Sequence, residues 1–426
     1  MSSREPPIPL VLKTSVNPSA SHLSPLSPSS TLTPPLTPTT PNDKPESCSG
    51  QNAPKHFIPA LMVSDEGGIE GVQAGLQKNN ALPREFTYDL ELQMDSGGNA
   101  IEYGRGAWSV VYSATSRWIS TTPDCPPTPP PCAPASCPTS VLAVKSPIRR
   151  DAHSILRAEA RLLTRLSNIP GAEHHIVPFH GFISSSHALV LSALPLSLSA
   201  YITSQAVSAR QVFSTKTMFD PVLGMPRWLS LAKKLVAGLE WLHSCGQIVH
   251  GDIKPQNILL RPREPANDSA EEDPFPYDPL YVDFTSSYDP STLEPCAQGQ
   301  GPSLSALTPP FAAPELLTVK SLKSTDLVQS KGSDVFSLAV TLLAAVTGDL
   351  LLYPGSSNMQ RLAMSKEGHL VLDYVRSGVH GSRLPVRGVA EKILAPAVVK
   401  DPEGRIKPAD WLRLINESIS SGGLKK

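Results

Sequence analysis

The chain has 426 residues, enough for one large or two ordinary domains at about 100–200 residues per domain. Its 37 basic and 38 acidic residues give a net charge of -1, which excludes a chain-wide charge attracting nucleic acid or an anionic membrane. It has no Cys-x-x-Cys pair, no apolar signal core at its N-terminus and no apolar run of the ~18 residues that suggest a membrane span. We therefore expect an intracellular protein, in the cytoplasm or the nucleus, with no nucleic-acid or membrane partner.

Residues 1–85 are predicted to form a disordered tail. Between Ser15 and Pro45 the sequence is mostly Ser, Thr, Pro and Leu, which offers too little apolar surface to offset chain entropy. Ser-Pro or Thr-Pro dipeptides begin here at Ser24, Ser27, Thr33, Thr37 and Thr40. One hypothesis is that a proline-directed kinase modifies this tail, and the alternative is a solvated linker that is never modified.

A globular composition begins at about Phe86 and continues to Ile419. Two proline-rich segments interrupt it, at 121–140 and at 263–279. Because proline cannot donate to a β-ladder, we interpret both segments as surface loops inserted between strands.

A glycine-containing turn lies near the start of the globular part. Gly104 and Gly106 form a Gly-x-Gly turn, and the β-branched residues that follow predict a strand. Glycine lets backbone N–H groups approach phosphate oxygens without an intervening Cβ. A strand after the turn argues against a dinucleotide fold, in which a helix follows, but the turn alone fits a hairpin without a ligand better than a phosphate site.

A short apolar strand at 141–145 ends in Lys145, and an amphipathic helix is predicted over 151–167. The apolar stripe of this helix consists of Ile155, Leu162 and Leu166. Glu159 falls on the same stripe, and a carboxylate on a buried face needs a partner, for which Lys145 is the candidate. The alternative is that Glu159 lies at the edge of the stripe and reaches water.

A second amphipathic helix is predicted over 228–244, and a polar loop flanked by apolar runs follows it. Residues 248–260 of this loop read Ile-Val-His-Gly-Asp-Ile-Lys-Pro-Gln-Asn-Ile-Leu-Leu. A loop containing His, Asp, Lys and Asn can hold a hydroxyl, a metal ion and a phosphate at once. A strand predicted over 280–284 delivers one more carboxylate, Asp283.

These motifs occur in the order typical of eukaryotic protein kinases of the serine/threonine type, and the chain resembles that family from about Phe86 to Ile419. The matching segments are Gly-x-Gly-x-x-Ser-Val-Val from Gly104, Ala-Val-Lys ending at Lys145, the helix residue Glu159, His-Gly-Asp-Ile-Lys-Pro-Gln-Asn from His250, Asp-Phe-Thr from Asp283, Thr-Pro-Pro-Phe-Ala-Ala-Pro-Glu from Thr308, Ser-Asp-Val-Phe-Ser-Leu from Ser333, and Asp-Pro-Glu-Gly-Arg ending at Arg405. The resemblance implies a two-lobed α+β fold, with a small, mostly β N-lobe at about 86–191 and a larger, mostly α C-lobe at about 195–419.

The resemblance also implies ATP as phosphate donor, Mg²⁺ as metal and proteins as substrates. The residues implied to bind ATP are Gly104 and Gly106 over the phosphates, Val111, Ala143 and Leu259 against the adenine, and Lys145 at the phosphates, held by Glu159. Asp252 would orient the substrate hydroxyl and accept its proton, while Lys254 would stabilise the transferring phosphate. Asn257 and Asp283 would hold Mg²⁺. This chemistry needs mainly positioning and charge neutralisation.

Three further matched residues are implied to be structural. Glu315 would pair with Arg405 and brace the larger lobe. Asp334 would tie the polar loop to the apolar helix that follows it, which is predicted to be a buried core element.

Two other classes of function are weighed against this one. A small-molecule kinase of the aminoglycoside phosphotransferase type shares the His-Gly-Asp opening, but Lys254, Thr308 and the Ala-Pro-Glu and Asp-Pro-Glu-Gly-Arg motifs favour protein substrates. A pseudokinase scaffold would bind partners without transferring phosphate, and the presence of Lys145, Asp252 and Asp283 argues against it.

The chain departs from the family pattern at three positions in the site, of which Ser109, in place of the third glycine of the loop, is the mildest. Gly251 stands where many members have an arginine that pairs with a phosphate on the activation segment, so we hypothesise that this enzyme does not need that phosphate. Thr285 stands where the family usually has the glycine of Asp-Phe-Gly. Because threonine is stiffer than glycine, we expect Asp283 to flip out of the site less readily.

Overall fold

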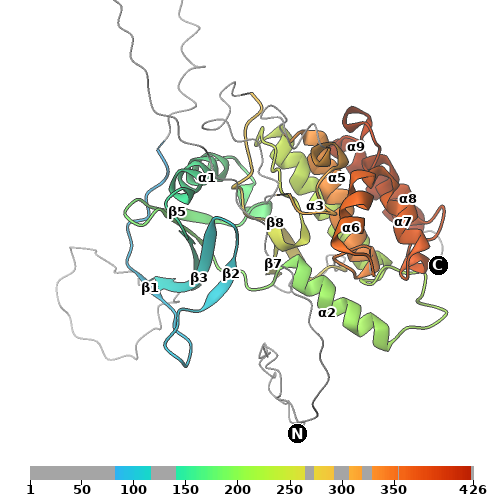
Figure 1. Cartoon of the computed structure of the whole chain (residues 1–426), viewed down its shortest axis with the longest axis horizontal. Coiled ribbons are helices and arrows are strands. Elements are labelled where there is room, and N and C mark those ends of the chain that lie inside the picture. Colours follow the sequence, from blue (N-terminus) through green and yellow to red (C-terminus); the bar gives the residue numbers. More distant parts are fainter. Residues whose placement is uncertain are drawn as a thin grey trace, which may run out of the picture. The chain divides into compact units, whose positions relative to one another are not determined.

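The computed structural model describes residues 82–116, 141–263, 273–291, 307–318, 329–353 and 355–423. The predicted disordered tail, except for its last four residues, lies outside these ranges. So do the insert at 121–140 and residues 264–272 of the second insert. Figure 1 shows the described elements in the order of the chain.

An antiparallel sheet of six strands forms the N-terminal part of the fold (Figure 1). Its strands are β1 (Leu90–Leu92), β2 (Glu102–Arg105), β3 (Ser109–Ser116), β4 (Val141–Pro147), β5 (Phe179–Ile183) and β6 (Ala188–Ser192). Their order is β1-β3-β4-β6-β5, and β2 also pairs with β3. The strand predicted after the Gly-x-Gly turn is confirmed as β3, which pairs antiparallel with β2, and β4 places Lys145 in the middle of the sheet.

Helix α1 (Ala152–Ser167) packs against β4, β5 and β6, and its buried face overlaps the predicted stripe only at Glu159 and Leu166. Leu156, Leu163 and Leu166 are buried, whereas Ile155 and Leu162 are only half-buried. One residue along a helix turns the side chain by about 100°. The stripe that faces the sheet therefore lies about 100° from the predicted one. Glu159 lies on this inner face with 2% exposure, so the alternative in which it reaches water is wrong.

The C-terminal part is mostly helical and also contains one hairpin. Its helices are α2 (Leu198–Gln211), α3 (Met225–Ser244), α5 (Lys331–Thr347), α6 (Asn358–Lys366), α7 (Val371–Ser377), α8 (Val389–Leu394) and α9 (Pro408–Gly423), and its hairpin is β7 (Ile258–Pro262) with β8 (Tyr277–Tyr281). Helix α3 begins three residues before the predicted start. Gly224, with φ 77°, precedes it, and Pro226 occupies the first turn, where a missing N–H costs no helical bond.

Helix α5 is the most buried helix of this part, as predicted for a core element. Every residue from Ser333 to Thr347 is buried. Its N-cap Ser330 accepts from the backbone N–H of Ser333, whose own side chain binds back to the cap residue, which forms a capping box. None of the helices in the described ranges combines the length and the apolar character that a bilayer span requires.

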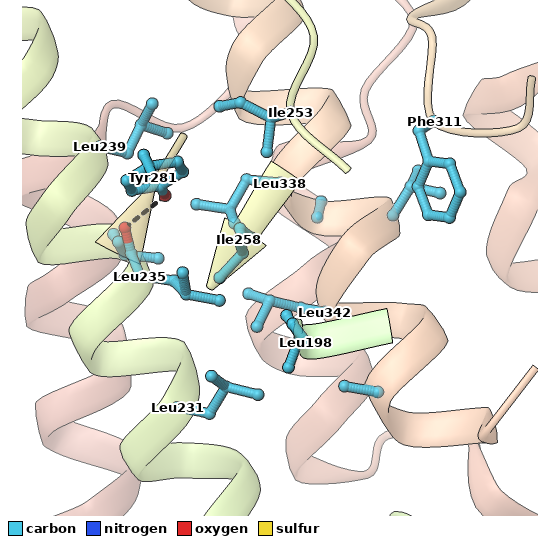
Figure 2. Packing of buried hydrophobic residues seen from close by; sticks show 14 of the residues in the cluster. Leu198, Leu231, Leu235, Leu239, Ile253, Ile258, Tyr281, Phe311, Leu338 and Leu342 are labelled. Atoms are coloured by element: carbon cyan, nitrogen blue, oxygen red, sulfur yellow. Dashed lines mark hydrogen bonds between the residues drawn. The ribbon is translucent and has the colours of Figure 1, made fainter. Parts of the chain in front are cut away.

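Helices α3 and α5 meet across the core that supports the polar loop. Figure 2 shows the side chains that point into this shared space, including Leu231 and Leu235 of α3 and Leu338 and Leu342 of α5. Tyr281, at the end of β8, donates from its hydroxyl to the Leu235 carbonyl at 2.8 Å. Burying each leucine contributes about 1.5–3 kcal/mol, so this packing fixes the hairpin and its loops against the helices.

The end of the second proline-rich segment is not a surface loop, which corrects the predicted insert at 263–279. Phe275 is fully buried, and β8 already begins at Tyr277 and pairs antiparallel with β7. Pro279 lies opposite Leu260 in this pairing. Proline is tolerated there because, in a sheet of two strands, each strand is an edge.

Residues 84–86, here called the N-terminal strap, form hydrogen bonds with both the sheet and α1. The domain was predicted to begin only at Phe86. The backbone N–H of Arg84 donates to Thr164 Oγ1 at 2.9 Å, and its guanidinium Nη2 donates to Asn168 Oδ1 at 3.2 Å. Phe86 N donates to Phe182 O at 2.9 Å. A Cβ on Gly181 would lie 2.8 Å from Phe86 N, so the strap approaches β5 closely only because that residue is glycine.

Candidate active site

A buried cluster of one lysine and two carboxylates lies where β4, α1 and the residues after β8 meet. Lys145 Nζ is 2.8 Å from both carboxylate oxygens of Glu159 and 2.8 Å from Asp283 Oδ1. The backbone N–H of Phe284 donates to Glu159 Oε1 at 2.9 Å. The predicted pairing of Lys145 with Glu159 is confirmed, and Asp283 joins the pair from 138 residues further along the chain.

The cluster carries more negative than positive charge. Burial alone would lower the pKa of Lys145, but the carboxylates of Asp283 and Glu159 raise it above its usual value. Burial would raise the pKa of Asp283, but the Lys145 ammonium and the Thr285 hydroxyl hold it well below its usual range. Asp283 is therefore ionised at neutral pH, and its side chain, 37% exposed, presents charge that attracts a cation.

Asp283 lies outside the strand that was predicted to carry it. Strand β8 ends at Tyr281, and Asp283 occupies a turn with φ 67°, a left-handed conformation that costs a non-glycine residue about 1–2 kcal/mol. Thr285 donates from Oγ1 to Asp283 Oδ1 at 2.8 Å. The threonine that replaces the expected glycine thus binds the carboxylate and stabilises its place in the turn.

A second cluster forms around Asp252 in the polar loop. Lys254 Nζ donates to Asp252 Oδ2 at 2.7 Å, and Asn257 Nδ2 donates to the same oxygen at 2.9 Å and to the Asp252 carbonyl at 2.8 Å. Lys254 also donates to Thr308 Oγ1 at 3.1 Å. Burial raises the pKa of Asp252 to about 6, although the charge of Lys254 opposes the shift.

The polar loop is anchored to the start of α5. Asp334 accepts the backbone N–H groups of His250 at 2.7 Å and Gly251 at 2.9 Å, and His243 lies 3.0 Å from the same carboxylate. The prediction that Asp334 ties the loop to this helix is confirmed. The anchor holds the backbone immediately before Asp252.

The residues predicted to contact adenine lie on two sides of one apolar cluster. Ala143 on β4 pairs with Leu191 on β6, and Val111 on β3 pairs with Lys145. Leu259 on β7 reaches the same cluster from the C-terminal part. Ala143 thus belongs to the main hydrophobic core, and Val111 and Leu259 pack against it, with Ala143 and Val111 on the strand of Lys145 and its neighbour.

The glycine turn is held to β4 by contacts that the sequence did not indicate. Gly106 N donates to Ser109 O at 2.8 Å, which closes the turn. The guanidinium of Arg149 lies 4.5 Å from the centre of the Trp108 ring, and Ile148 N donates to the Trp108 carbonyl at 3.1 Å. Arg149 also pairs with Asp151 at 2.9 Å, so this side chain joins the turn to the residue preceding α1.

A buried ion pair braces the C-terminal part, as predicted. Arg405 donates from Nη1 and Nη2 to the two carboxylate oxygens of Glu315, at 2.8 and 2.7 Å. Its guanidinium also donates to the carbonyls of Val399 and Gly332 at 2.9 Å each. This bidentate geometry joins the segment after Thr308 to the loops beside α5.

Residues 140–407, more than half of the chain, match the protein kinase domain family. The chain belongs to the protein kinase family. Similar proteins include the serine/threonine-protein kinase ISR1 of Eremothecium gossypii, 31% identical over 183 residues, 37% of this chain and 44% of that protein. ISR1 of Saccharomyces cerevisiae is 29% identical over 188 residues, 41% of this chain and 37% of that protein. Serine/threonine-protein kinase D of Synechocystis is 25% identical over 197 residues, 45% of this chain and 32% of that protein.

The chain spans less than half the length of each of these curated relatives. The family match begins next to β4, so the glycine turn and strands β1 to β3 precede the matched residues. The two-lobed α+β architecture of the kinase family accounts for what the structure describes, with a sheet and α1 in the N-lobe and the helices in the C-lobe. The assignment of Gly104 and Gly106 rests on the turn itself and on its antiparallel strands.

Proposed function

We propose that this protein transfers the γ-phosphate of Mg·ATP to serine or threonine hydroxyls of protein substrates. The observation that carries the proposal is the pair of lysine–carboxylate clusters, one around Lys145 and Asp283 and one around Asp252 and Lys254. Asp283 lies close enough to Asp252 for its charge to help burial raise the pKa of Asp252. Membership of the kinase family and the names of the similar proteins support the same reaction.

The residues present fit Mg²⁺ and ATP. Asp283 is an ionised oxygen ligand, and Asn257 directs its amide nitrogen to Asp252, which leaves its amide oxygen as the atom able to bind a cation. Mg²⁺ in proteins takes one or two such oxygens together with phosphate oxygens and water. When bound, the ion would neutralise phosphate charge, and Lys145, held by Glu159, would add a fixed positive charge beside it.

The chain's own groups in the second cluster would act on the substrate. Asp252 would accept a hydrogen bond from the substrate hydroxyl, orient its oxygen and take its proton. Lys254, held between Asp252 and Thr308, would place its ammonium near the transferring phosphate, where charge on the equatorial oxygens needs stabilisation. Fixed positions of these groups lower the barrier because they need no reorganisation during transfer.

We also propose a single kinase domain over 86–419, extended at its start by residues 84 and 85 of the N-terminal strap, with loop inserts at 121–140 and within 263–279. The contacts of Arg84 with α1 support a start two residues before Phe86. Modification of the tail by a proline-directed kinase stays a hypothesis. Mass spectrometry of protein from its native cells tests it, and finding only unmodified peptides across 24–40 would end it.

The experiment that tests the function is transfer of labelled phosphate from Mg·ATP to a generic protein substrate. We expect wild type to transfer, and Asp252→Asn and Asp283→Asn to abolish transfer. Asp373→Asn, a change on the exposed surface of α7, serves as the matched control and should leave transfer intact. Phosphoamino-acid analysis should find phosphoserine or phosphothreonine. Binding of ATP without any transfer by wild type would contradict the proposal and favour a pseudokinase.

A further inference from the structure

The three residues that precede Asp252 have partners for all of their backbone polar groups. The N–H groups of Val249, His250 and Gly251 donate to Tyr288 O at 2.9 Å, Asp334 Oδ2 at 2.7 Å and Asp334 Oδ1 at 2.9 Å. The corresponding carbonyls accept from Tyr288 N at 3.1 Å, Ser287 Oγ at 2.8 Å and Gln329 Nε2 at 2.9 Å. Side chains supply four of these six bonds, and Gln329 supplies the last one before Asp252.

Gln329 is a buried polar residue that the predicted reaction does not use. It stands immediately before the cap of α5 and is 6% exposed. Its carbonyl accepts from the hydroxyl of Tyr288, so contacts fix both its backbone and its side chain. Burying an amide destabilises the folded state unless its hydrogen bonds are made. Because Gln329 makes these bonds, its amide has a defined contact to maintain.

The side chain of Gln329 occupies the space beside Gly251. A Cβ on Gly251 would lie 2.7 Å from Gln329 Oε1 and 2.6 Å from the carbonyl of Ser286. Gly251 also has φ 81°, a conformation that glycine adopts readily and that needs outside contacts to be held. Gln329 thus fills the space that a side chain on Gly251 would occupy, and its bond to the Gly251 carbonyl restrains the backbone there.

The restraint reaches Asp252 through one planar peptide group. The Gly251 carbonyl and the Asp252 N–H belong to the same peptide unit, whose atoms lie in one plane. A bond to that carbonyl therefore sets the direction of the Asp252 N–H, which donates to His250 Nδ1 at 3.3 Å. The same plane contains the Asp252 Cα, from which the side chain extends.

We propose that Gln329 is a positioning residue for phosphate transfer. Its amide holds the Gly251–Asp252 peptide, so that the Asp252 carboxylate meets the substrate hydroxyl in a fixed orientation. The contact is uncharged and internal to the chain. The inference rests on the proposed function, because it assigns Gln329 a role in the reaction of Asp252.

Two substitutions in the full chain separate the hydrogen bond from the volume of the side chain. Gln329→Met keeps a similar size but has no donor, and Gln329→Ala also leaves a gap. We expect Gln329→Met to lower kcat about 5- to 20-fold, the effect of losing one well-placed hydrogen bond. The KM for ATP should stay within about twofold, because Lys145 and its carboxylates do not touch Gln329.

The matched control is Gln211→Ala, a glutamine exposed at the end of α2, which should leave kcat unchanged. If Gln329→Met does not fold, Tyr288→Phe tests the same contact more mildly, because it removes the hydroxyl that binds the Gln329 carbonyl. This variant should lower kcat by a smaller factor, again without a change in the KM for ATP.

The outcomes are distinct from those of the proposed function. Wild type without transfer would defeat the proposed function and this inference together. Active wild type with a Gln329→Met variant of unchanged kcat would overturn this inference alone. Equal losses of kcat, ATP affinity and Tm in Gln329→Met and Gln329→Ala would also overturn it, because they would indicate general destabilisation. A fall in kcat in a folded Gln329→Met variant with unchanged ATP affinity supports it.

Discussion

The two clusters of the site contain the same chemical pair, a lysine 2.7–2.8 Å from an aspartate, in different surroundings. Lys145 is almost fully buried and contacts two carboxylates, and its charge lowers the pKa of Asp283. Lys254 is 19% exposed and contacts one carboxylate, and burial raises the pKa of Asp252 to about 6. The surroundings thus give the two aspartates different properties. Asp283 keeps its charge and is suited to a metal ion, whereas Asp252 is able to accept a proton.

The largest effect is expected from removing the proposed proton acceptor, Asp252. Asp252→Asn should lower kcat by about 10²–10⁴-fold, because general-base catalysis contributes that much. The affinity for ATP should remain, since the cluster around Lys145 is untouched. Steady-state kinetics and nucleotide titration check both parts, and a matching loss of ATP affinity would break the division between the clusters.

Removing the cation of the other cluster should affect stability as well as activity. Lys145→Met leaves the carboxylates of Glu159 and Asp283 without their shared partner, so we expect a loss of about 3–5 kcal/mol in the free energy of unfolding. The loss in kcat/KM should be about 10²–10³-fold. Chemical denaturation and kinetics measure the two effects. Unchanged stability would show that Lys145 is not essential to the cluster.

The pH dependence of kcat should report Asp252 and not Asp283. Because the pKa of Asp252 is raised to about 6, the carboxylate is ionised above that pH and protonated below it. Activity is therefore expected to be full at pH 8 and to fall as pH drops through about 6, approaching tenfold per unit. Asp283 stays ionised over this range. A profile of kcat between pH 5 and 8 tests this, and a midpoint near 4 would contradict the assignment.

The contact between Arg149 and Trp108 should affect ATP binding only modestly. An exposed cation–π contact contributes about 0.5–1 kcal/mol, so Arg149→Ala should raise the KM for ATP by about two- to fivefold with little change in kcat. Arg150→Ala, at the neighbouring exposed position, is the control. A change confined to kcat would mean that Arg149 does not act through the glycine turn.

The smallest effect is expected from dephosphorylation. Gly251 carries no cation to bind an activation-segment phosphate, and the uncharged amide of Gln329 occupies the space beside it. Activity measured before and after phosphatase treatment should therefore be the same. Loss of all activity, restored by phosphorylation of the activation segment alone, would refute the hypothesis.

The sequence predicted most of the residues that meet in the site because each stands in a compact motif. Lys145 and Glu159 could be paired because helical periodicity put the carboxylate on a buried face. The exact face of α1 could not be predicted, since apolar side chains also stand one position away from the predicted stripe, at Leu156 and Leu163. Strand β8 was placed too late because its first residues resemble the proline-rich segment before them.

The contacts that could not be predicted from the sequence join residues far apart along the chain. Gln329 lies 78 residues from Gly251, and no local pattern distinguishes it from a solvated glutamine. Arg84 lies 80 residues from Thr164, in a stretch whose composition predicted a tail. Such contacts depend on the folded arrangement of several elements, which composition and periodicity along the chain do not encode.

The close approach of the N-terminal strap to β5 predicts that mutations at Gly181 weaken the fold. Alanine at Gly181 would place its methyl group 2.8 Å from Phe86 N, on a strand that carries none of the residues proposed to touch ATP or substrate. The strap would have to shift, which would strain the bonds from Arg84 to α1, the helix that carries Glu159. A search for temperature-sensitive alleles should therefore find Gly181, a position that lies outside every catalytic motif of the chain.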